Sequence, residues 1–145
     1  MDLSKENQEN LKLALYPGKF DHFTEANDDI IQKALLVFDQ VLILACDKNE
    51  EKAKQKAVVL AEYYENHPNV GVGYWSNLLV NFIQNTRVSA VIRTLKNNTG
   101  LRQEQDLYYS HQDLGIQIPF VYFMASREKA HMSSKIHQNV LDYLN

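Results

Sequence analysis

The chain has 145 residues, of which 45% are hydrophobic and 23% are charged, with a formal net charge of -3 at pH 7 and one cysteine, Cys46. This length fits one domain, and the ordinary composition excludes disorder throughout, collagen-like repeats and coiled coils. One cysteine excludes an intrachain disulfide framework and a multi-cysteine zinc site. The acidic balance argues against a broad nucleic-acid-binding surface.

Residues 1–10 are polar and acidic, unlike a signal peptide, and no apolar run reaches the ~18 residues of a membrane span. We therefore expect a flexible N-terminal tail over residues 1–10 and a single domain over residues 11–145. We expect the protein to be cytoplasmic, with neither a membrane nor a nucleic acid as partner.

The first predicted elements are a strand and a helix joined by a glycine-containing loop. Leu11–Tyr16 is a short apolar run, which indicates a strand, and Pro17-Gly18 after it indicates a turn. Asn27–Phe38 has apolar residues at helical spacing, which predicts a helix. Asn27 or Asp28 is a suitable cap for that helix.

The middle of the chain repeats this alternation. Gln40–Ala45 is a continuous apolar run, typical of a strand covered on both faces. Lys48–Tyr64 is rich in Ala, Glu and Lys, which predicts a helix, and a strand is expected over Val70–Tyr74 after the break at His67-Pro68. Asn77–Gln84 predicts a short helix.

The last part of the chain predicts two further strands. Ala90–Arg93 is the fourth, and Ile118–Phe123, with Pro119 near its start, is the fifth. Between them we expect a helix from about Leu101 to His111, and Ser133–Leu144 predicts a closing helix.

Strands that alternate with helices at this spacing predict an α/β fold, with a five-stranded parallel sheet and helices on both faces. In such folds ligands bind at the carboxyl ends of the strands. Candidate site residues should therefore lie in the loops that follow the five strands, which are Pro17–Asn27, Cys46–Lys54, Gly73–Asn77, Arg93–Glu104 and Ala125–Lys135.

Two of these loops carry residues that suit an anion. Gly18 allows a close backbone approach, Lys19 adds charge, and a helix start at Asn27 offers free N–H groups. Arg93 ends an apolar strand, and Lys96 follows it. The alternatives are an ordinary strand–turn–helix junction and, for Arg93, an ion pair with Glu104 or another carboxylate.

Ser133-Ser134 allows two interpretations, a helix N-cap and a phosphate contact, which share one geometry. Among the five histidines, only His22 and His131 fall in ligand-edge loops, whereas His67, His111 and His137 are expected at the surface. The histidines lack metal-ligand spacing. The sequence also lacks the GxSxG, GxxxxGK[ST] and GxGxxG motifs of hydrolases, P-loop proteins and dinucleotide-binding proteins.

A family resemblance rests on short motifs in a fixed order. Tyr16-Pro17-Gly18 with Phe20-Asp21 matches YPGxFDP, and Thr24 matches the first residue of TxGH. Ile92-Arg93 matches the start of IRGLR, and Ser133-Ser134 matches ISS(S/T). From Leu13 to about Leu141 the chain resembles bacterial phosphopantetheine adenylyltransferases of the HxGH nucleotidyltransferase superfamily.

The resemblance implies a Rossmann-like nucleotidyltransferase fold and a reaction of coenzyme A biosynthesis. AMP would pass from ATP to 4′-phosphopantetheine, which gives dephospho-coenzyme A and pyrophosphate, with Mg²⁺ as cofactor and a homohexamer as the assembly. The implied site residues fall into three groups: Asn27, Lys19 and Arg93 for catalysis; Gly18, Phe20, Thr24, Lys96, Glu104, Ser133, Ser134 and Lys135 for the nucleotide and its phosphates; and Leu78, Leu79 and Lys48 for the acceptor. No residue is implied as a metal ligand.

The chain departs from the family pattern mainly at charged positions. Asn27 stands where the family has the histidine of TxGH, and Glu25-Ala26 precedes it. The loop after the second strand is shortened where the family supplies a substrate-binding lysine, which Lys48, Lys52 or Lys54 could replace. Two hypotheses follow: a divergent adenylyltransferase, or an inactive homologue that binds a nucleotide or coenzyme A-type ligand or serves as an oligomeric scaffold.

Overall fold

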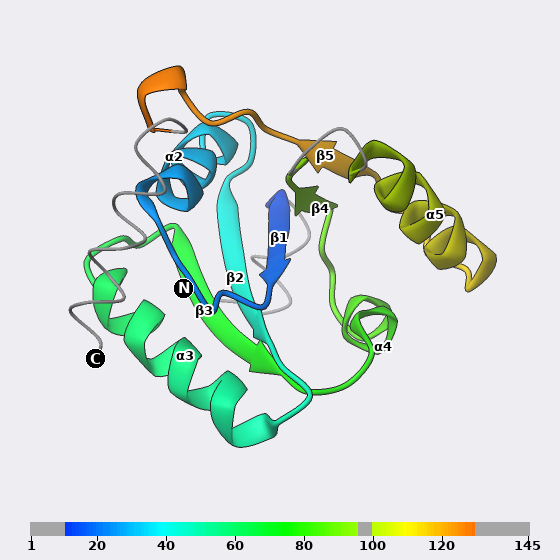
Figure 1. Ribbon diagram of the computed structural model, residues 1–145, viewed down its shortest axis with the longest axis horizontal. Coiled ribbons are helices and arrows are strands. Elements are labelled where there is room, and N and C mark those ends of the chain that lie inside the picture. Colours follow the sequence, from blue (N-terminus) through cyan, green and yellow to red (C-terminus); the bar gives the residue numbers. More distant parts are fainter. Residues whose placement is uncertain (1–10, 96–99, 130–145) are drawn as a thin grey trace.

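The computed structural model describes residues 11–95 and 100–129, in which strands and helices alternate along the chain (Figure 1). The strands are β1 (Leu13–Gly18), β2 (Gln40–Cys46), β3 (Val70–Trp75), β4 (Ala90–Arg93) and β5 (Phe120–Tyr122). The helices are α2 (Glu25–Ala34), α3 (Glu50–Tyr63), α4 (Leu79–Gln84) and α5 (Gly100–Asp113). None of the helices in these two ranges is long and apolar enough to cross a membrane.

All five strands form one parallel sheet in the order β3-β2-β1-β4-β5, which confirms the predicted fold class. The chain builds outward from β1 to β3 and then returns to the other side of β1 with β4. The order therefore switches between β1 and β4, and a ligand crevice is expected at the carboxyl ends of these two strands.

Helices cover both faces of the sheet, as the alternation predicted. Successive residues of β1 point to opposite faces, so Ala14 and Tyr16 pack with α2 and α3, whereas Leu13 and Leu15 pack with α4. Figure 1 shows α2 and α3 on one side of the strands and α4 on the other, with α5 beside β5. The central strands are buried on both faces, which explains their continuous apolar runs.

Three local predictions differ from the structure. Pro17-Gly18 continues β1 instead of turning, because Gly18 still pairs with Ala45 on β2. Helix α2 is capped by Thr24, which has an extended backbone, and not by Asn27 or Asp28. β5 spans only three residues and begins after Pro119. The predicted tail over residues 1–10 and the closing helix over 133–144 lie outside the described residues.

Candidate functional site

A pocket of about 740 Å³ opens at the carboxyl ends of β1 and β4, where the strand order switches. Six of the predicted site residues line it together: Gly18, Lys19, Phe20, Asn27, Arg93 and Glu104. His22, the histidine that the sequence placed in the first ligand-edge loop, lines the same pocket. The fold thus brings two segments that lie about 70 residues apart in sequence into one site, as expected for this sheet topology.

The loop after β1 folds back over the end of its own strand. Phe20 has a φ of 51°, a left-handed conformation that non-glycine residues adopt at a cost. Its ring lies so close to Gly18 that a Cβ at Gly18 would be 2.7 Å from the Phe20 Cζ atom. The ring also packs edge-to-face on Tyr16 and Phe23. A Cβ at position 18 would therefore have to displace the Phe20 ring.

Asn27 is fixed by hydrogen bonds on both sides of its amide. Its Oδ1 accepts from the Thr24 N–H at 2.8 Å and from the Thr24 hydroxyl at 3.1 Å, and its Nδ2 donates to the Tyr16 hydroxyl at 2.9 Å. Burial raises the pKa of Tyr16, so this partner stays a neutral phenol. The second hydrogen of the Asn27 amide makes no bond within the described part of the chain, and Asn27 lines the pocket.

Arg93 forms a bidentate ion pair with Glu104 in the pocket wall. Its Nε and Nη2 donate to the two carboxylate oxygens at 2.9 and 2.8 Å, and the Tyr122 hydroxyl donates to Oε2 at 3.1 Å. Burial alone would lower the pKa of Arg93, but Glu104 more than offsets this and raises it. Burial and the same carboxylate raise the pKa of Tyr122 to about 12. The ion pair that the sequence left open as an alternative is therefore formed, at the edge of the pocket.

Other predicted site residues lie elsewhere. Thr24 caps α2 and does not line the pocket, and Lys48 is exposed in the loop between β2 and α3. Leu78 is the N-cap residue of α4 and its side chain is exposed, whereas Leu79 packs against the core on that face. The remaining predicted residues, Lys96, His131, Ser133, Ser134 and Lys135, lie outside the described residues.

The prediction from the sequence was wrong for one histidine. His111 was expected at the surface, but it is buried, with 6% of its surface exposed. Its ring packs edge-to-face on Phe120 of β5, because this side of α5 faces the sheet edge. Its Nδ1 has no partner among the described residues, and burial lowers its pKa.

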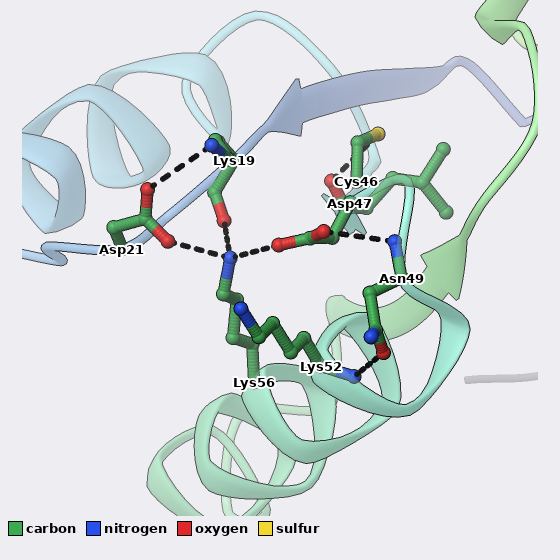
Figure 2. Close-up of polar contacts among 8 residues, drawn as sticks. Lys19, Asp21, Cys46, Asp47, Asn49, Lys52 and Lys56 are labelled. Atoms are coloured by element: carbon green, nitrogen blue, oxygen red, sulfur yellow. Dashed lines mark hydrogen bonds and ion pairs between the residues drawn. The ribbon is translucent and has the colours of Figure 1, made fainter.

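The sequence missed Lys56, a lysine of α3 that reaches the loop after β1 (Figure 2). Its ammonium binds the carboxylates of Asp21 at 2.6 Å and Asp47 at 2.9 Å. The bond to Lys56 holds the pKa of Asp21 and of Asp47 below the usual value, so both are ionised at neutral pH. A signal was present, since Lys56 follows Ala53 by three residues and precedes Leu60 by four, which places it on the buried side of its helix.

The described residues contain no group of three or more His, Cys, Asp or Glu side chains that could hold a metal ion. In the pocket, the carboxylate of Asp21 already binds Lys56, and that of Glu104 binds Arg93. Both of these pocket carboxylates are therefore engaged by cations of the protein.

Several known proteins are similar to the chain over most of its length. The protein named phosphopantetheine adenylyltransferase from Nautilia profundicola is 30% identical to the chain, over 90% of the chain and 87% of the relative. Those of Campylobacter fetus subsp. fetus and Christiangramia forsetii are 32% and 30% identical, over 91% and 92% of the chain and 86% and 90% of the relatives. No protein-family model matches the chain.

A solved structure agrees in fold. It is that of a lipopolysaccharide core biosynthesis protein from Thermoplasma volcanium, with a TM-score of 0.60 and 10% identity. The match covers 81% of the chain and 99% of the solved one, which supports the Rossmann-like arrangement and no more. The sequence relatives decide the family: the chain belongs to the phosphopantetheine adenylyltransferases.

Proposed function

We propose that the protein transfers the adenylyl group of ATP to 4′-phosphopantetheine in the pocket at the ends of β1 and β4. One observation carries this proposal: Lys19, Asn27 and Arg93 line a single pocket at the switch point of the sheet, in a chain that belongs to this family. The products would be dephospho-coenzyme A and pyrophosphate.

The reaction is a displacement at phosphorus. A phosphate oxygen of 4′-phosphopantetheine attacks the α-phosphorus of ATP, a new P–O bond forms, and the bond to the β-phosphate oxygen breaks and releases pyrophosphate. No covalent enzyme intermediate is needed, so the protein orients two anions and stabilises the charge of the transition state. Lys19 and Arg93 would supply positive charge, and the Asn27 amide would supply a neutral N–H donor.

We expect Mg²⁺ to enter with ATP. Magnesium is commonly bound by substrate phosphates with only one or two protein carboxylates, and it keeps several waters. Asp21 and Glu104 are carboxylates of the pocket, although each is engaged by a cation of the protein. The ion would partly neutralise the phosphates and so ease their approach to the acceptor.

Asn27 also supports a second candidate, an inactive homologue that binds a nucleotide or a coenzyme A-type ligand. The amide is fixed by Thr24 and Tyr16 and carries no charge, so it cannot replace an imidazolium fully. Losing one preorganised electrostatic donor typically slows an enzyme by ~10²–10³. The two candidates share the pocket and differ only in turnover.

Pyrophosphate release from ATP, 4′-phosphopantetheine and Mg²⁺ tests the proposal, beside calorimetric binding of ATP. Lys19→Met is the site variant, because the Lys19 side chain is 70% exposed and its loss spares the core. Lys12→Met is the matched control, since Lys12 is exposed next to the amino end of β1, at the opposite edge of the sheet. Release that falls at least ~10-fold in Lys19→Met alone supports an enzyme. ATP binding without pyrophosphate release in the parent supports the second candidate. If the parent shows neither binding nor release, both candidates are refuted.

A further inference from the structure

Lys56 makes three contacts that join the loop after β1 to the body of the protein (Figure 2). Its Nζ donates to Asp21 Oδ1 at 2.6 Å, to Asp47 Oδ2 at 2.9 Å and to the Lys19 carbonyl oxygen at 3.0 Å. An ammonium has three N–H donors, so this one is fully used. The Lys56 side chain is 18% exposed, although it does not line the pocket itself.

Two of these contacts lie on either side of the strained residue of the loop. The Lys19 carbonyl immediately precedes Phe20, whose φ of 51° is unfavourable, and the Asp21 carboxylate follows it. A conformation of this kind persists only where the surroundings hold it. Lys56 stabilises the conformation of Phe20, since it binds the Lys19 carbonyl before Phe20 and the Asp21 carboxylate after it.

The third contact connects the loop to a fixed point of the sheet. Asp47 follows β2, its N–H donates to the Trp75 carbonyl at 3.1 Å, and its Oδ1 accepts from the Asn49 N–H at 2.9 Å. The Lys56 ammonium also offsets the repulsion between two ionised carboxylates. Without this cation, Asp21 and Asp47 would repel each other. Removing Lys56 would therefore both release the loop and push it away.

We propose that Lys56 is a positioning residue, which holds Lys19–Asp21 in the conformation that places Lys19 and His22 at the pocket. The inference deepens the proposed function and rests on it, since the held loop would serve to bind the phosphates of ATP. Lys56 acts through its neighbours and contacts no ligand.

The test compares Lys56→Met with Lys56→Arg, which keeps the charge, and with Lys12→Met, which removes a lysine charge at the opposite edge of the sheet. The first readout is the rate of trypsin cleavage after Lys19 in the folded protein, measured by mass spectrometry of the fragment that begins at Phe20. Cleavage in native protein follows the population of the open loop. The second readout is the affinity for inorganic pyrophosphate and for ATP, by calorimetry well below the melting temperature.

We expect Lys56→Met to raise cleavage after Lys19 and to weaken both ligands, each by at least ~10-fold, because charge-assisted hydrogen bonds are lost. Lys56→Arg should return both the cleavage rate and the affinities most of the way to the parent values, and Lys12→Met should match the parent. Cleavage or affinity unchanged in Lys56→Met overturns the proposal, as does an equal effect in Lys12→Met. If the parent binds neither pyrophosphate nor ATP, the proposed function fails, and the cleavage rates still decide whether Lys56 holds the loop.

Discussion

The Arg93–Glu104 pair should contribute measurably to the stability of the pocket wall. Arg93→Met removes the guanidinium and leaves the Glu104 carboxylate, whose side chain is only 11% exposed, without two hydrogen bonds of 2.8 and 2.9 Å. Removing one partner of a fully buried pair costs about 3–5 kcal/mol. The Arg93 side chain is 25% exposed, so we expect a loss near the lower limit, about 3 kcal/mol. For a chain of this size that lowers the Tm by roughly 6–12 °C.

Urea unfolding followed by far-UV circular dichroism measures this loss, and Glu104→Gln completes a double-mutant cycle. Arg93→Met/Glu104→Gln should be more stable than the sum of the two single losses predicts, because the double variant has no buried carboxylate that has lost its guanidinium partner. Arg102→Met is the control, since Arg102 is exposed on the same helix as Glu104 and should cost less than ~0.5 kcal/mol. An Arg93→Met loss below about 1 kcal/mol, or additive losses in the cycle, would refute the reasoning.

Three further predictions concern single positions. Asn27→His should raise pyrophosphate release by up to ~10², because an imidazolium adds charge at the pocket; unchanged release would place the block elsewhere. Gly18→Ala should cost about 1–3 kcal/mol in urea unfolding, since its Cβ would meet the Phe20 ring, and a neutral result would contradict the fold-back. Burial lowers the pKa of His111, so its contribution to stability is complete above the unfolded pKa near 6.5 and is lost as the pH falls below it. His111→Leu should reduce that loss between about pH 7 and 5, and an unaltered pH profile would exclude His111 as its source.

The sequence alone determined the class of fold and the approximate positions of the strands. Continuous apolar runs such as Gln40–Ala45 and Ala90–Arg93 correspond closely to β2 and β4, because a strand buried on both faces needs an apolar residue at nearly every position. The sequence also selected Gly18, Lys19 and Arg93, since residues at the carboxyl ends of parallel strands meet at one edge of the sheet. Signals of this kind depend on neighbouring residues and on strand direction, so they can be read without knowing the strand order.

Tertiary structure decided the partners of the charged and buried groups. Lys56 binds the Lys19 carbonyl 37 residues away, and His111 is buried because α5 packs beside β5, so neither follows from local spacing. The N-cap of α2 at Thr24 depends on the Asn27 amide, whose own position is fixed by Tyr16 on β1. Ion pairs and buried polar groups form between segments that only the sheet order brings together, and their energies depend on burial that no single segment determines.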